Sequence, residues 1–190
     1  MSLKIWIAVA ASVSVLFAAG GAGAVVTIIG NGLAAACSTA ARHAADNWPS
    51  RSEGEQECTL ALENEALSGH ETAATYVNRG VLHLSDGSAE PARRDFERAL
   101  RIEPALPEAL VDRGAALIAG GRDADGAAEI TRGLALNPTE PEKAYYNRGV
   151  AEERVGDLKS AYFDYLKASD LKPAWPLPKT ELVRFKVSPR

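Results

Sequence analysis

From residue 73 to residue 173, apolar and small side chains recur at intervals of three and four positions, with charged side chains between them. This spacing places the apolar residues on one face of an α-helix and predicts a series of amphipathic helices. Glycines and prolines interrupt the pattern regularly; a glycine favours a helix end, and a proline stops a helix. The interrupting residues are Gly87, Gly121 and Gly156, and Pro104, Pro138 and Pro173.

Three segments, 73–104, 107–138 and 142–173, align with one another in register. Each contains an Arg-Gly pair, which begins at Arg79, Arg113 or Arg148, so the pair recurs after 34 and then 35 residues. A period of this length is typical of solenoid proteins, in which each unit is one small supersecondary element stacked on the next.

Equivalent positions of the three segments carry side chains of similar size. Small residues at positions 20 and 27 let neighbouring helices approach closely, while bulky residues at positions 4 and 24 fill the space between them. The small residues are Ala92, Ala99, Gly126, Gly133, Ala161 and Ala168. The bulky residues are Tyr76, Phe96, Leu110, Ile130, Tyr145 and Tyr165.

These landmarks resemble the tetratricopeptide repeat, which consists of helix A, a tight turn and helix B. The resemblance covers residues 73–173 and implies an all-α fold. We expect an α-solenoid of three helix-turn-helix repeats, at 73–106, 107–141 and 142–173, between an N-terminal half-repeat and a C-terminal capping helix.

The repeat frame extends toward the N-terminus. Residues 37–72 are expected to form a degenerate half-repeat, because Cys58 falls at position 20 of an incomplete copy. Ser52 and Glu55 have the spacing of a capping box before a helix over 53–67, which Gly69 follows. The first helix of this copy is broken at Trp48-Pro49.

The frame also extends toward the C-terminus. Residues 174–190 are expected to form a capping helix over 178–185 and a tail, because a proline is tolerated at the start of a helix. A repeat array needs such caps to cover its apolar ends. The residues expected to cover this end are Trp175, Leu182 and Phe185.

Residues 1–36 are expected to be a signal peptide or a membrane anchor. Lys4 precedes an uncharged run, 5–29, that is long enough to span a bilayer as a helix. Small-residue cleavage sites follow at Ala22-x-Ala24 and Ala34-x-Ala36; an uncleaved anchor and a buried core helix are the alternatives. Whether the N-terminal segment is cleaved or kept as an anchor, residues 37–190 would lie outside the cytoplasm, in the periplasm or tethered to the membrane. Contact with the membrane would be made only through residues 5–29, if that run is retained.

Two weaker motifs follow the uncharged run. Cys37 is preceded by an Ala-rich stretch, as in a bacterial lipobox, but the leucine of that motif stands one position too early here. Lipid attachment to Cys37 after cleavage is therefore only a minor alternative. Gly30-x-Gly32-x-x-Ala35 resembles a dinucleotide-binding turn. No Val or Ile occurs between Ile29 and Val77 to form the second strand that such a unit needs, so no dinucleotide cofactor is expected.

Cys37 and Cys58 are the only two cysteines. An even count in an exported protein favours a disulfide, which would stabilise the half-repeat by about 3 kcal/mol in the chain-entropy model. The alternatives are two free thiols, or a Cys58 that serves only as the small residue at position 20.

The formal net charge is −4, with 24% charged and 46% hydrophobic residues. A mildly acidic chain without a Lys/Arg cluster is a poor nucleic-acid binder. Motifs of hydrolases, zinc proteases and phosphate-binding loops are absent, and His43, His70 and His83 share no metal-ligand spacing. We therefore expect no enzyme, no cofactor, no metal site and no nucleic-acid partner.

The resemblance implies that helix A lines a concave surface that binds another protein or a peptide. Some proteins of this family clamp a terminal carboxylate there with Lys and Asn. Here the fifth position of helix A is Val or Tyr and the ninth is Val or Ala, so we expect no such clamp. The predicted groove residues are Val77, Asn78, Val81, Val111, Asp112, Ala115, Tyr146, Asn147 and Val150. The alternative is that several of the apolar ones pack within the solenoid.

The expected function is therefore that of a non-catalytic protein–protein interaction module, a scaffold or adaptor. The alternative is a structural accessory or self-associating subunit of an envelope complex.

Gly126 and Gly133 stand where the neighbouring repeats have alanine, and glycine inside a helix costs about 1 kcal/mol relative to alanine. We expect their joint replacement by alanine to stabilise the second repeat by about 1–2 kcal/mol, provided that the methyl groups fit.

Overall fold

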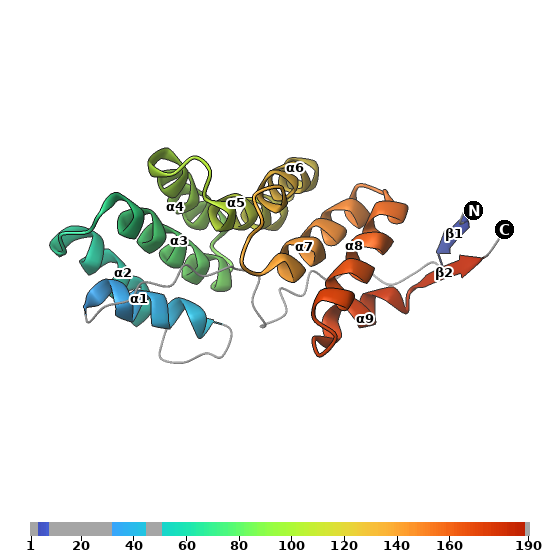
Figure 1. Ribbon diagram of the computed structural model, residues 1–190, viewed down its shortest axis with the longest axis horizontal. Coiled ribbons are helices and arrows are strands. Elements are labelled where there is room, and N and C mark those ends of the chain that lie inside the picture. Colours follow the sequence, from blue (N-terminus) through green and yellow to red (C-terminus); the bar gives the residue numbers. More distant parts are fainter. Residues whose placement is uncertain (1–3, 8–31, 45–50, 189–190) are drawn as a thin grey trace.

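The computed structural model describes residues 4–7, 32–44 and 51–188 of the 190-residue chain. Its helices follow one another in chain order from α1 at one end to α9 at the other, with a two-stranded sheet beyond α9 (Figure 1). The helices are α1 (Leu33–Arg42), α2 (Arg51–Asn64), α3 (Gly69–Ser85), α4 (Ala89–Ile102), α5 (Pro107–Ala119), α6 (Asp123–Leu134), α7 (Pro141–Arg154), α8 (Leu158–Leu171) and α9 (Pro176–Leu182). The strands β1 (Lys4–Ile7) and β2 (Phe185–Ser188) pair antiparallel.

The all-α repeat fold expected from the sequence is confirmed. The pairs α3–α4, α5–α6 and α7–α8 are the three repeats, and each pair is joined at the predicted turn glycine. Gly87, Gly121 and Gly156 have φ values of 77°, 78° and 89°, which side chains rarely permit. In each case the amide after the glycine donates to a carbonyl five residues earlier at 2.8 Å, which closes the end of helix A.

The core lies between helix A and helix B of each repeat. The bulky residues predicted at position 24, Phe96, Ile130 and Tyr165, are at most 1% exposed. The small residues at positions 20 and 27 are buried in all three repeats, as the alignment predicts. Each helix A also packs against helix B of the preceding repeat, so the hydrophobic contacts continue from one hairpin to the next.

The N-terminal half-repeat consists of two helices, α1 and α2. Helix α1 spans the expected boundary between residues 36 and 37, and its first amides, those of Leu33 and Ala34, donate to the carboxylate of Glu65 at 2.7 and 3.0 Å. A disulfide joins Cys37 of α1 to Cys58 of α2, and both side chains are fully buried.

The capping box predicted at Ser52 and Glu55 is wrong, because α2 already begins at Arg51 and ends at Asn64. The box is formed instead by Ser68 and Glu71 at the start of α3, where the Ser68 amide donates to Glu71 Oε2 at 2.8 Å and the Glu71 amide donates to Ser68 Oγ at 3.2 Å. Gly69, expected after a helix, is therefore the first residue of α3.

The C-terminal cap is shorter than expected. Helix α9 ends at Leu182 rather than Phe185, because the amides of Val183 and Arg184 close a tight turn before β2 begins. The aromatic side chains still cover the end of the array: Trp175 lies 5.1 Å from the ring of Tyr146, and Phe185 lies 6.0 Å from the ring of Tyr165.

Most of the predicted signal or anchor segment, including Ala22-x-Ala24, lies outside the described residues. Its described residues Lys4–Ile7 form β1, with Lys4 opposite Ser188 of β2. In the part of the chain that the structure describes, no helix combines the length and the hydrophobicity that a membrane span requires.

The expectation that alanine at Gly126 and Gly133 stabilises the second repeat is contradicted by the packing. A Cβ on Gly126 would lie 2.7 Å from the carbonyl oxygen of Gly114 and 2.5 Å from Cγ1 of Ile118. A Cβ on Gly133 would lie 2.6 Å from a methyl group of Val111. Helices α5 and α6 therefore approach backbone to backbone, and the glycines are needed for this contact.

We therefore predict that Gly126→Ala destabilises the protein by about 1–3 kcal/mol, the usual cost of overpacking a filled core. Urea unfolding followed by circular dichroism measures the change. Gly69→Ala is the matched control, because its Cβ would meet only a methyl group of Ile102 at 3.7 Å, and we expect no loss of stability there. An unchanged or higher midpoint for Gly126→Ala contradicts the proposed close contact.

Candidate functional site

The nine predicted groove residues lie on three successive A helices, α3, α5 and α7, and their burial changes along the array. Those of the first two repeats are at most 4% exposed, whereas those of the third repeat are half-buried. The buried residues are Val77, Asn78, Val81, Val111, Asp112 and Ala115, and the half-buried residues are Tyr146, Asn147 and Val150.

The packing partners explain part of this burial. Val77 and Val81 belong to the same hydrophobic cluster as Cys37 and Ala41, so α1 of the half-repeat packs against α3. Val111 packs in the next cluster with Ile130 of α6 and Ala144 of α7. This burial favours the alternative that several apolar residues of the helix A face belong to the solenoid core.

Tyr146 on α7 is the largest of the half-buried residues. Its hydroxyl donates to Glu181 Oε1 of α9 at 3.2 Å, and its ring lies 5.1 Å from Trp175 and 5.6 Å from Tyr165. Burial, together with the neighbouring Glu181 carboxylate, raises the pKa of Tyr146, so the phenol stays neutral and acts as a donor. The cap thus lies directly on the accessible part of the helix A face.

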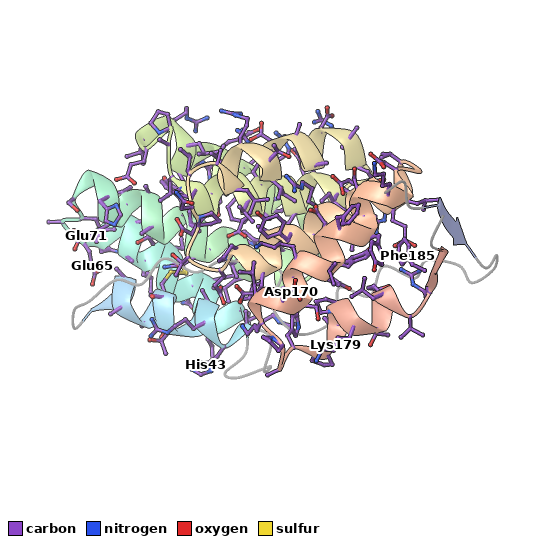
Figure 2. All side chains as sticks on the ribbon, turned by 45° about the vertical axis from the view of Figure 1, so that its right-hand side comes forward. His43, Glu65, Glu71, Asp170, Lys179 and Phe185 are labelled. Atoms are coloured by element: carbon purple, nitrogen blue, oxygen red, sulfur yellow. A yellow bond between two sulfur atoms is a disulfide. The ribbon has the colours of Figure 1, made fainter. Side chains whose placement is uncertain are left out.

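Ionic contacts fix the cap in this position. Arg184 donates to Glu153 Oε2 of α7 at 2.8 Å and also pairs with Glu181. The same Glu153 oxygen accepts a hydrogen bond from the buried Tyr165 hydroxyl at 2.9 Å. Figure 2 shows Lys179 and Phe185 on this segment, at the end of the array opposite α1. A ligand that reaches Tyr146 therefore has to displace or accommodate α9.

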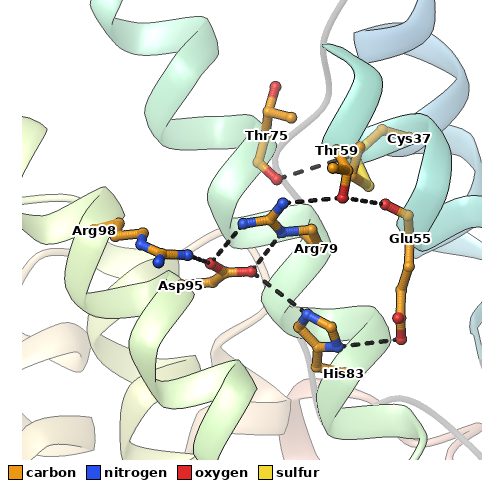
Figure 3. Close-up of polar contacts among 9 residues, drawn as sticks. Cys37, Glu55, Thr59, Thr75, Arg79, His83, Asp95 and Arg98 are labelled. Carbon is orange, nitrogen blue, oxygen red and sulfur yellow. Dashed lines mark hydrogen bonds and ion pairs between the residues drawn. A yellow bond between two sulfur atoms is a disulfide. The ribbon is translucent and has the colours of Figure 1, made fainter. Parts of the chain in front are cut away.

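The arginine of each Arg-Gly pair binds a carboxylate of helix B in its own repeat. Arg79 makes two hydrogen bonds to Asp95, at 2.7 and 2.9 Å, and Arg148 makes two to Asp164 at the same distances (Figure 3 for Arg79). Arg113 makes one to Glu129, at 2.6 Å. The sequence showed the arginine but not its partner, although an acid stands 16 residues later in every repeat.

Two of these arginines also contact the preceding repeat. Arg79 donates to Thr59 of α2 at 3.0 Å, and Arg148 donates to Thr131 of α6 at 3.1 Å. Each guanidinium thus joins its own helix A to helix B of the same repeat and to the second helix of the preceding unit. The planar, forked arrangement of its N–H donors suits such a double contact. The pairs hold neighbouring hairpins together.

One helical turn after the arginine, the three repeats differ in chemistry. In the first repeat, His83 lies 3.2 Å from Glu55 Oε1 and 3.7 Å from Asp95 Oδ2 (Figure 3). In the third, Glu152 lies 3.7 Å from the guanidinium of Arg148. Burial and the neighbouring Asp164 raise the pKa of Glu152 to about 7. In the part of the chain that the structure describes, no group of three His, Cys, Asp or Glu side chains could hold a metal ion.

We predict that Asp95→Asn lowers the free energy of unfolding by about 3 kcal/mol, because it leaves the largely buried Arg79 without a counter-charge. Asp125→Asn is the control: its pair with Arg122 is more than half exposed, so its loss should cost less than about 1 kcal/mol. Urea unfolding measures both variants. If Asp95→Asn and Asp125→Asn lower the free energy of unfolding equally, burial does not strengthen the Arg79–Asp95 pair.

Family and structure comparisons agree with this architecture. Residues 73–106 and 142–174 match the model of the tetratricopeptide repeat family. These segments are the first and third repeats, at α3–α4 and α7–α8, and the matches support the tetratricopeptide repeat assignment.

Solved structures with the same fold share 18–23% of their residues with this chain. The first tetratricopeptide repeat domain of Spaghetti (RPAP3), bound to an HSP90 peptide, has a TM-score of 0.55 at 23% identity, covering 60% of this chain and 89% of that chain. The second such domain of human RPAP3, in complex with an HSP70 peptide, has a TM-score of 0.55 at 23% identity, covering 61% of this chain and 96% of that chain. MamA has a TM-score of 0.58 at 18% identity, covering 70% of this chain and 74% of that chain.

Proposed function

We propose that this protein is a non-catalytic interaction module that binds an extended peptide or a helix of another protein on its helix A face. The observation that carries the proposal is the array of three stacked tetratricopeptide-like hairpins. Such arrays form continuous surfaces that suit extended ligands. Two proteins of the same fold, the RPAP3 domains, have been solved with bound peptides.

The third repeat is the place on the helix A face where we expect a partner to bind, with α9 displaced or accommodated. Tyr146, Asn147 and Val150 are half-buried there, whereas the equivalent residues of the first two repeats are buried. Tyrosine combines a large apolar ring with a hydrogen-bonding hydroxyl, and such residues often dominate binding. Because the fifth and ninth positions of helix A hold Val, Tyr or Ala in all three repeats, in place of the Lys and Asn of a carboxylate clamp, binding should not require a free C-terminus on the peptide.

We predict that Tyr146→Ala weakens binding at least about 10-fold, the usual effect of removing a central aromatic contact. A crosslinked pull-down from the native envelope supplies the partner, and binding is then measured by titration. Asn78→Ala changes the helix A face of the first repeat, where the side chain is fully buried, and we expect it to leave binding nearly unchanged. Circular dichroism checks that the helix content of both variants is unchanged.

Phe163→Ala is the matched control, because this aromatic side chain is 46% exposed on helix B of the same repeat. We expect it to bind as the unsubstituted protein does. If Tyr146→Ala leaves binding unchanged and Phe163→Ala abolishes it, the helix A face is not the binding site. Stable self-association without a peptide ligand would instead support the alternative of a structural subunit.

We further propose that residues 37–190 function outside the cytoplasm, in the periplasm or tethered to the membrane. Support comes from Lys4 before an uncharged run and from the buried Cys37–Cys58 disulfide, a bond that persists in oxidising compartments. We predict that alkaline phosphatase fused to the C-terminus of the full chain is active in bacterial cells, because this enzyme needs disulfides of its own. Activity of a cytoplasmic reporter alone would exclude export.

A further inference from the structure

The cap segment, residues 174–185 with α9 at its centre, is weakly anchored to the third repeat. Helix α9 has seven residues, and Pro178 is the one among them that is buried. Val183, directly after the helix, is 85% exposed. A helix this short is not stable in isolation, so the cap segment keeps its shape only through its contacts with the array. Local opening is expected to begin in such a segment, because it buries few apolar groups.

The side-chain contacts that hold the cap segment on α7 are aromatic and polar. Tyr146 donates its hydroxyl to Glu181 Oε1 at 3.2 Å, and its ring lies 5.1 Å from the ring of Trp175. Arg184, whose side chain is 37% exposed, donates to Glu153 Oε2 at 2.8 Å. Aromatic contacts, hydrogen bonds and ion pairs of this kind also join separate proteins, so another chain can make the same contacts.

The first two repeats show a different chemistry at the position of Tyr146. The equivalent residues are Val77 and Val111, which are at most 1% exposed and belong to the hydrophobic clusters of the array. A valine is satisfied by apolar packing, whereas a tyrosine hydroxyl also needs a hydrogen-bonding partner. The third repeat therefore offers a contact that a polar, aromatic segment can make and release.

We propose that the cap segment is an internal ligand of the third repeat, and that a partner segment of the same chemistry displaces it. This displacement rests on the proposed function, in which the partner binds the helix A face at Tyr146. The partner segment supplies an aromatic ring and a carboxylate for Tyr146 and a cation for Glu153. In the free protein these groups come from Trp175, Glu181 and Arg184.

The order of these groups along the chain defines the partner further. The acidic residue Glu181 follows the aromatic residue Trp175 by six positions, and the basic residue Arg184 follows three positions later. The Arg184 amide donates to the carbonyl of Glu181 at 3.0 Å, and the two side chains also pair, so they lie one turn apart on the same side. We therefore expect the partner to present a short helix with this aromatic, acidic and basic order.

The tether gives the cap segment an advantage over any free segment. Only residues 172–175 join α8 to α9, so the effective concentration of the cap segment at the third repeat is on the order of mM. A partner at micromolar concentration therefore binds poorly while the cap segment is in place. Each contact that the cap segment loses should increase the affinity for the partner.

The test uses the full chain, with its disulfide intact, and a fluorescently labelled peptide of residues 174–185 as the probe. Fluorescence anisotropy should show weak binding to the unsubstituted protein. Trp175→Ala in the protein should raise the affinity for the peptide at least about 10-fold, and Arg184→Gln should raise it about 2–5-fold. Lys179→Ala is the matched control, because this side chain donates to the carbonyl of Pro173 in its own segment, and we expect no change.

Two further measurements separate displacement from a loosened fold. Adding Tyr146→Ala to Trp175→Ala should abolish the gain in affinity, and a peptide that itself carries Trp175→Ala should bind the Trp175→Ala protein poorly. Circular dichroism and urea unfolding check that each variant is folded. Arg184→Gln removes only a partly exposed ion pair, so it keeps the test valid if Trp175→Ala disturbs the end of the array.

Displacement of the cap segment is excluded if Trp175→Ala and Arg184→Gln bind the peptide no better than the unsubstituted protein does. It is also excluded if the gain in affinity survives Tyr146→Ala. The probe comes from the chain itself, so neither result depends on the native partner. A native partner whose binding does not respond to Tyr146→Ala would contradict the proposed function separately.

Discussion

The structure depends on the contact between the Arg-Gly pair of helix A and helix B of the same repeat. The glycine brings the helices so close that a Cβ on Gly80 would lie 2.5 Å from the ring of Phe96. The arginine then neutralises a carboxylate, Asp95, that this close packing buries. A single hairpin buries too little apolar surface to be stable by itself, and stacking the hairpins buries a continuous apolar surface.

The sequence alone predicted the features that repeat: the period, the turn glycines, the bulky and small core positions, and the helix pairs. It failed where a repeat departs from its neighbours. Gly126 is not simply a less stable replacement for the alanine of the other repeats. A Cβ at this position would lie 2.7 Å from the carbonyl oxygen of Gly114 on α5. Alignment compares positions along the chain and carries no information on how closely two particular helices cross. The capping box failed for a related reason, since Ser68 and Glu71 fit the same local pattern as Ser52 and Glu55.

For the candidate site, the sequence could place residues on a helix face but could not say what covers that face. Val77 and Tyr146 occupy equivalent positions, yet one is fully buried and the other half-buried. The difference depends on contacts between residues distant in the chain: α1 packs on the first repeat, and Glu181 and Trp175 of the cap lie on the third. Hydrophobic periodicity reports that a face is apolar, but the same pattern serves a core and a binding surface.

Equivalent positions in a repeat need to share geometry, not chemistry. His83, Leu117 and Glu152 all fill the edge between helix A and helix B, and the fold accommodates an imidazole, an aliphatic side chain and a carboxylate there. The arginine beside each one makes this possible, because its guanidinium satisfies the helix B carboxylate whatever residue stands next to it. In the middle repeat this position holds Leu117, a buried aliphatic side chain without a charge. A charged or titratable side chain at this position is therefore not a requirement of the repeat.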